Sequence, residues 1–186
     1  MYDNKPENDL KQLMQLAKNG DTEAFGRLYE LYFTPVYRYI YLRTKNKEEA
    51  EDLSQAVFVK VFKSIGAFRE QNKQPLAFFF TVARNTVIDH WRKRKEILTD
   101  KPPETLSAES FENPQRLIDQ KSTAQAVYQA IENLTEEQQE VVILKFINDL
   151  TTAEIAKILG KKEDAIRQTQ CRALKILKRY FNEHEI

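Results

Sequence analysis

The sequence has little cysteine, histidine, glycine or proline, and each shortage excludes a class of structure. Cys171 has no second cysteine for an internal disulfide, and the two histidines, His90 and His184, cannot assemble a metal cluster of the usual ligand spacing. Four glycines and six prolines among 186 residues leave long stretches without a helix breaker. We therefore expect an all-α chain that carries neither a metal nor another cofactor.

Long hydrophobic runs and an excess of one charge are also missing. No apolar run approaches the roughly 18 residues that a membrane span requires, and residues 1–6 lack the apolar core of a signal peptide. With 29 basic and 28 acidic residues, any binding of nucleic acid must come from local clusters of charge. The expectation is a cytoplasmic protein without membrane insertion.

Residues 75–95 join an aromatic block to a basic end within one predicted helix. Pro75 suits the first helical position, and Gln74 can cap it. One face is apolar and is predicted to be core: Leu76, Phe80, Ala83, Val87 and Trp91. The other face mixes aromatic, amide and cationic groups: Phe78, Thr81, Asn85, Ile88, Asp89, Arg92 and Lys93. That face could stack on unpaired bases and neutralise phosphates, but a buried helix with a solvated basic end fits the same pattern.

Three helices are expected before this segment. Gly20 can end the first as a left-handed cap, and Asp21 can cap the second, which should kink or break near Pro35. Asn46 and Glu49 resemble a capping box that opens the third helix. The outer face of that helix sets polar groups beside apolar ones, which favours a partner-binding surface: Glu48, Glu51, Asp52, Gln55, Phe58, Val59 and Phe62.

Residues 96–121 are polar, acidic and proline-bearing, and are predicted to form a flexible linker with Phe111 and Leu117 as anchor points. Further helices follow, one of which carries Val141, Val142, Leu144 and Phe146. Asn148 and Asp149 should turn the chain.

Capping boxes are expected at Thr135–Gln138 and Thr151–Glu154. A short helix ending at Gly160 and a longer basic helix then form a helix-turn-helix pattern, for which an ordinary helical hairpin is the alternative.

The last helix divides into an inward and an outward face. The inward residues are predicted to be Ile166, Ala173, Leu174, Leu177 and Phe181, with Cys171 as a packing residue. Arg167 suits bidentate contact with guanine and Gln168 contact with adenine, whereas the later cations suit phosphates. The predicted DNA-binding set is Lys162, Arg167, Gln168, Arg172 and Lys175.

Three motifs in this order resemble the extracytoplasmic-function (ECF) group of bacterial RNA polymerase sigma factors. They are EAEDLSQAVF at 49–58, FFFTVARNTVIDHWRKR at 78–94, and LTEEQQEVV at 134–142 with TAEIAKILG at 152–160. The resemblance implies that residues 1–95 are sigma region 2, which binds core polymerase and melts promoters, and that residues 122–186 are region 4, which reads the minus-thirty-five element.

The resemblance also implies partners and site residues. The partners are core RNA polymerase, promoter DNA and an anti-sigma factor. Polymerase would meet Glu51, Asp52, Gln55, Phe58 and Phe62. The minus-ten DNA would meet Phe78, Phe79, Arg84, Asn85, Asp89, Arg92, Lys93 and Arg94, with the loop at 69–73 taking a flipped base.

Two other classes of protein are alternatives to a sigma factor. A stand-alone helix-turn-helix regulator would bind duplex DNA as a dimer without polymerase. An enzyme would need a nucleophile with a nearby base or a phosphate-cradling glycine loop, and Cys171 with two distant histidines provides neither.

Overall fold

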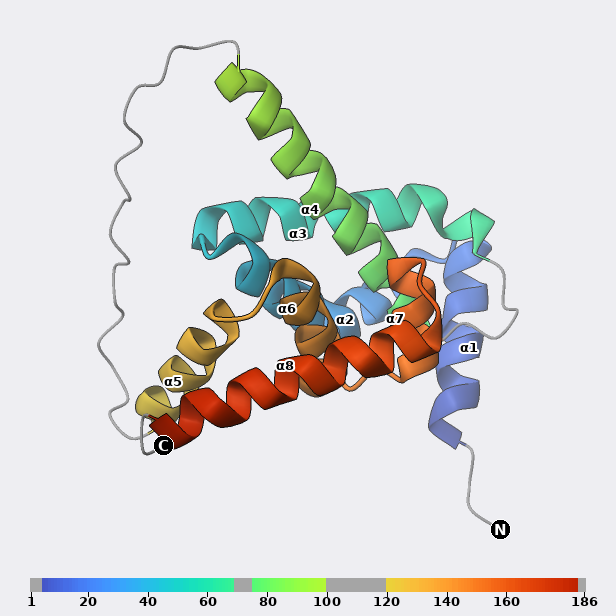
Figure 1. Ribbon diagram of the computed structural model, residues 1–186. Coiled ribbons are helices and arrows are strands. Elements are labelled where there is room, and N and C mark those ends of the chain that lie inside the picture. Colours follow the sequence, from blue (N-terminus) through green and yellow to red (C-terminus); the bar gives the residue numbers. More distant parts are fainter. Residues whose placement is uncertain (1–4, 69–74, 100–119, 184–186) are drawn as a thin grey trace.

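The computed structural model describes residues 5–68, 75–99 and 120–183, and within these ranges the chain is all-α with no strand (Figure 1). The N-terminal domain comprises α1 (Lys5–Lys18), α2 (Thr22–Thr44), α3 (Lys47–Ser64), the short 3₁₀ turn η1 (Ile65–Ala67) and α4 (Pro75–Thr99). The C-terminal domain comprises α5 (Gln120–Glu132), α6 (Glu136–Val142), the π-helical turn η2 (Ile143–Ile147), α7 (Thr152–Leu159) and α8 (Glu163–Glu183). The predicted fold class is confirmed.

The predicted caps explain where most of these helices begin and end. Gly20 follows α1 at φ +93°, and Asp21 caps α2 by accepting a hydrogen bond from the Ala24 N–H. Both capping boxes, Thr135–Gln138 and Thr151–Glu154, are formed in full. The box predicted at Asn46 is only half formed: the Asn46 side chain caps Glu49 N–H at 3.0 Å, while the Glu49 carboxylate binds α4 instead.

Two predicted breaks in the helices are absent. Helix α2 is continuous through Pro35 from Thr22 to Thr44, so of the kink or break expected there, the break is absent. Helix α4 runs to Thr99 and α5 begins at Gln120, so helix extends into both ends of the segment predicted as linker. Gln74, Phe111, Leu117, His184 and the loop at 69–73 lie outside the described residues.

The N-terminal domain packs α2, α3 and α4 around aromatic and β-branched side chains. Tyr39, Val57, Phe79 and Phe80 are each 1% exposed or less, and at this burial each apolar side chain stabilises the fold by about 1.5–3 kcal/mol. Leu76 and Trp91 of the predicted core face lie only half-buried against this cluster.

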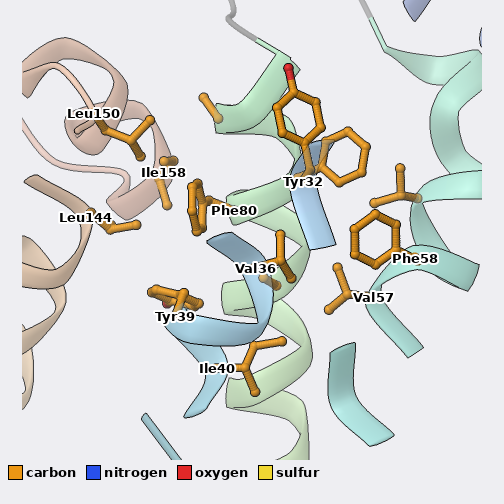
Figure 2. Close-up of a cluster of buried hydrophobic side chains, with 14 of the residues drawn as sticks. Tyr32, Val36, Tyr39, Ile40, Val57, Phe58, Phe80, Leu144, Leu150 and Ile158 are labelled. Carbon is orange, nitrogen blue, oxygen red and sulfur yellow. The ribbon is translucent and has the colours of Figure 1, made fainter. Parts of the chain in front are cut away.

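The same core continues into the C-terminal domain. Figure 2 shows Leu144, Leu150 and Ile158 beside Phe80 and Tyr39, and all five belong to one cluster of buried residues. A smaller cluster joins α5, α6 and α8 through Ile131, Leu134, Val142 and Ala173. The two domains therefore lie directly against each other.

Leu174 was predicted to face inward and Cys171 to be a packing residue, but both are exposed. Phe146 is 52% exposed and Leu174 is 41% exposed. The π-helical turn explains Phe146, because its wider winding shifts side chains away from the face that a regular helix would give them. Leu174 follows the buried Ala173 by about 100° around α8, which is enough to carry it out of the apolar stripe.

Candidate nucleic-acid and polymerase interfaces

Helix α4 presents a polar face away from the core, as the sequence predicted. Asn85, Arg92 and Lys93 are exposed, while Asp89 is intermediate and accepts a hydrogen bond from Arg92 at 3.1 Å. The core of the domain holds the opposite side of the helix through Phe80, Ala83 and Val87. The exposed face is thus carried on a rigid element and combines amide, carboxylate and cationic groups.

The aromatic start of α4 differs from the prediction. Phe79 is fully buried, with its ring centroid 4.8 Å from that of Tyr32 and 5.4 Å from that of Phe58. It lies in the core and does not offer a surface for bases. Phe78 is half-buried, edge-on to Phe68 at 5.3 Å, and is the aromatic side chain of this pair that still reaches the surface.

Two cations of the predicted minus-ten set bind carboxylates of other helices. Arg84 Nε lies 3.0 Å from Oε1 of Glu140 on α6. Arg94 Nη1 lies 2.8 Å from Oε1 of Glu49 on α3, and His90 Nε2 is 3.4 Å from the other oxygen of the same carboxylate. Arg94 remains half-exposed, whereas Arg84 lies within the contact between the domains.

The outer face of α3 is acidic and partly apolar. Glu51, Asp52 and Gln55 are exposed. Phe62 is 49% exposed and meets Phe25 of α2 edge-on at 4.9 Å. Val59, beside it, is 53% exposed.

Phe58 does not belong to this outer face, contrary to the prediction. It is 4% exposed and packs against Tyr29, whose ring centroid is 4.7 Å away. The pattern within α3 alone could not show this, because the ring that covers Phe58 belongs to Tyr29 of the neighbouring helix α2.

The turn between α7 and α8 is fixed by Gly160, which takes φ +65° at the end of α7. Every residue of the predicted minus-thirty-five set is exposed on α8 or just before it: Lys162, Arg167, Gln168, Arg172 and Lys175. The Arg167 guanidinium is oriented by Asp164 at 2.7 Å and Glu163 at 3.0 Å. A shallow hollow of about 400 Å³ follows the same side of α8, and Cys171 and Leu174 form its apolar part.

Glu137 connects α6 to the helix-turn-helix. Its carboxylate lies 2.6 Å from Lys161 Nζ and accepts a hydrogen bond from the Thr169 hydroxyl at 3.1 Å. The hydrogen bond from Lys161 lowers the pKa of Glu137, with Thr169 acting in the same direction against partial burial. Thr169 therefore serves the packing of α8 on α6.

A cleft of about 360 Å³ lies where α4 faces α6 and α7, and its lining residues carry both signs of charge: Arg43, Arg84, Ile88, Trp91, Glu136, Glu137, Glu140, Leu159 and Lys161. No sequence pattern predicted this cleft, because glutamates in the first turns of a capped helix are typical of a solvated face. Across residues 5–68, 75–99 and 120–183, no cluster of three or more potential metal ligands is found. No helix in the described ranges is long and apolar enough to span a membrane.

Comparison with known proteins finds the same two regions in the same order. Residues 28–97 match the family described as Sigma-70 region 2, and residues 124–177 match Sigma-70, region 4. The chain is similar to the ECF RNA polymerase sigma factor BldN of Streptomyces coelicolor, with 37% identity over 91% of this chain and 65% of that protein. It is also similar to the ECF RNA polymerase sigma factor SigX of Bacillus subtilis, with 30% identity over 86% of this chain and 84% of that protein.

Two solved structures share the fold. CnrH in complex with the cytosolic domain of CnrY has a TM-score of 0.71 at 19% identity, covering 94% of this chain and 97% of CnrH. The sigma factor RpoE from Bartonella quintana, in complex with the anti-sigma factor NepR, has a TM-score of 0.69 at 22% identity, covering 85% of this chain and 96% of RpoE.

The fold is all-helical, two consecutive sigma-70 regions match, and the sequence is 30% identical to that of SigX. The chain therefore belongs to the ECF group of RNA polymerase sigma factors. It is a sigma factor that directs transcription initiation, and sigma factors are initiation factors without enzymatic activity of their own.

Proposed function

We propose that this chain binds core RNA polymerase through α3 and reads promoter DNA through α4 and α8. The observation that carries the proposal is the placement of exposed polar and cationic side chains on two helices whose opposite faces are fixed in the core. On α4 these are Asn85, Arg92 and Lys93, and at the start of α8 they include Arg167 and Gln168. Amide and guanidinium groups read base edges, and lysines neutralise phosphates.

The polymerase-binding surface comprises Glu51, Asp52, Gln55 and Phe62, with Phe25 of α2 packed behind Phe62. Apolar area bordered by acidic groups is typical of a docking surface, because the apolar part supplies affinity and the charges orient the partner. Phe58 is not included, since it is buried.

The minus-ten surface comprises Phe78, Asn85, Asp89, Arg92 and Lys93, with Arg94 at its edge. Arg84 joins it only once its contact with Glu140 is released. The minus-thirty-five surface comprises Lys162, Arg167, Gln168, Arg172 and Lys175. Residues 1–95 and 122–186 are the proposed units of these activities, which take place in the cytoplasm, where RNA polymerase is found, and include no catalytic step.

An anti-sigma factor is a further proposed partner. CnrH and the Bartonella quintana RpoE, which share this fold, are both described in complexes: CnrH with the cytosolic domain of CnrY, and RpoE with the anti-sigma factor NepR.

The experiment is run-off transcription with sigma-free bacterial core polymerase on a pool of randomised promoters, with and without this protein. Transcripts that depend on the protein, enriched in one upstream and one downstream motif, are expected. The alternative, a stand-alone regulator, predicts instead that the protein alone retains a duplex operator and that no protein-dependent transcripts form.

A further inference from the structure

None of the surfaces in the proposed function includes a residue of helix α1. This helix precedes residues 28–97, which match Sigma-70 region 2, and its buried side includes Met14 and Ala17, which are 2% and 3% exposed. Figure 1 shows the end of α1 beside η1. There the ammonium group of Lys18, the last residue of α1, donates a hydrogen bond to the Phe68 carbonyl at 3.1 Å. A charged side chain of α1 thus holds the backbone where the chain leaves η1.

The backbone of Phe68 is held on both sides of its Cα. Its N–H donates to the Ile65 carbonyl at 3.0 Å, and its own carbonyl accepts from Lys18. A hydrogen bond from a charged donor is stronger than one between neutral groups. Two fixed peptide planes fix φ and ψ of the residue between them, and with these the direction of the Cα–Cβ bond. Phe68 is also 6% exposed, so neighbouring side chains confine its ring.

The Phe68 ring lies against the aromatic side chain that the start of α4 brings to the surface. The ring centroids of Phe68 and Phe78 are 5.3 Å apart, with 62° between the ring planes. Phe78 also meets Phe79 edge-on at 6.2 Å, and Phe79 is fully buried. Such contacts are directional, because the edge of an aromatic ring is positive and its face negative. Two rings therefore orient Phe78: one is fixed in the core, and the other is held through Lys18.

The orientation of Phe78 bears on how well it can hold separated bases. Stacking on an aromatic ring is favourable for every base, but a side chain that must first be ordered loses part of this gain as conformational entropy. Base pairing competes with the stacked state, so strand separation depends on the part that remains. The orientation of Phe78 should therefore matter most on duplex DNA, and much less where the strands are already apart.

We propose that Lys18 of α1 is a positioning residue for promoter melting: through Phe68 it holds Phe78 in the orientation that stacks on separated bases. This inference rests on the proposed function, in which Phe78 belongs to the minus-ten surface. Lys18 need not touch DNA for this role, since the contact it makes is with the Phe68 carbonyl.

The experiment is run-off transcription by the full chain and core polymerase on two templates. Both carry one promoter recovered from the randomised pool, either fully paired or with mismatches that keep the minus-ten region open. The signal from core polymerase alone is subtracted, and the readout is the ratio of transcripts from the paired template to those from the open one. The variants are Lys18→Met, which removes the donor, and Lys18→Arg, which keeps a cationic donor. Lys11→Met, at an exposed lysine of the same helix, is the control.

We expect Lys18→Met to lower this ratio about three- to tenfold, which is the strength of one edge-to-face ring contact expressed as a ratio. Lys18→Arg should restore most of the ratio, and Lys11→Met should leave it unchanged. Phe68→Leu, which removes the ring but keeps the carbonyl that Lys18 binds, should lower the ratio as Lys18→Met does. A loss of stability alone would lower transcription from both templates together and leave the ratio as it is.

Two results would overturn the proposal. One is a Lys18→Met protein with native circular dichroism and the wild-type ratio, and the other is an equal loss in Lys18→Arg. If Lys18→Met does not fold, Phe68→Leu takes its place, and an unchanged ratio there overturns the proposal. Failure of the wild type on both templates would refute the proposed function itself, and this inference with it. A wild type that transcribes both templates, with the same ratio in every variant, would refute this inference alone.

Discussion

Glu49 at the start of α3 and Arg94 near the end of α4 form an ion pair, with Oε1 and Nη1 2.8 Å apart. His90, about one turn earlier on α4, faces the second oxygen of the same carboxylate at 3.4 Å. The beginning of the proposed polymerase-binding helix is thereby tied to the basic end of the proposed DNA-reading helix.

Replacing Glu49 should loosen this tie without uncapping α3. In Glu49→Ala the hydrogen bond from the residue 49 N–H to Asn46 survives, because the donor is in the backbone. Since Arg94 is half-exposed, we expect a loss of about 1 kcal/mol or less in the free energy of unfolding, shrinking at high salt. Urea denaturation at two ionic strengths measures it. Glu48→Ala, an exposed neighbour, is the control and should cost less.

Substitutions of the two phenylalanines of α3 should have different effects, one on stability and the other on polymerase binding. Phe58→Ala should lower the free energy of unfolding by about 3–5 kcal/mol, because the ring is 4% exposed. Phe62→Ala should cost much less, yet weaken binding in a titration of labelled protein with core polymerase. Asp52→Arg should weaken binding likewise, and the exposed Glu30→Arg on α2 is its control. Unchanged affinity in both Phe62→Ala and Asp52→Arg would remove α3 from the docking surface.

Arg167 should contribute sequence specificity at the upstream element. Glu163 and Asp164 hold its guanidinium near the start of α8, where a helix-turn-helix contacts base edges. Arg167→Ala should relax preference at one upstream position by about 1–3 kcal/mol, read out as motif enrichment in run-off transcription. Arg179→Ala, near the far end of α8, is the control. An equal loss of binding on every upstream sequence would make Arg167 a phosphate contact.

Alkaline pH should destabilise the N-terminal core through Tyr32. Burial raises the pKa of Tyr32 to about 12, so the unfolded chain releases this proton near pH 10 while the folded chain retains it. The unfolded state then binds fewer protons, and stability falls as the pH rises from about 10 toward 12. Tyr32→Phe should make that fall shallower, as measured by denaturation at a series of pH values. If the free energy of unfolding of Tyr32→Phe fell with pH as steeply as that of the wild type, Tyr32 would not be the cause of the fall.

The sequence predicted features that depend on local chemistry. Asp21, Thr135 and Thr151 cap their helices as expected, since a cap needs only a side chain and a backbone N–H three residues on. Helix α7 ends at Gly160, which takes a left-handed backbone conformation that glycine adopts without steric cost. The separation of α4 into core and polar faces followed from the helical period alone.

Features that depend on tertiary contact could not be predicted in this way. The ring centroids of Phe58 on α3 and Phe79 on α4 lie 5.4 Å apart. The periodicity within either helix does not show that these two side chains bury each other. Phe146 is exposed because η2 departs from regular winding. Glu140 is buried by partners from the other domain, so its own segment carries no sign of its role.

The hydrogen bond between Tyr39 and Glu140 joins residues 101 positions apart, which sets an order of events during synthesis on the ribosome. At about 5–20 residues per second, α2 waits on the order of 5–20 s after Tyr39 is made before its carboxylate partner is translated. Phe80 likewise precedes Leu150 and Ile158. The N-terminal half of each nascent chain therefore leaves the ribosome before the apolar side chains that cover it have been made. Translation speed and chaperones that bind nascent chains should thus affect how much protein folds with its two domains in contact.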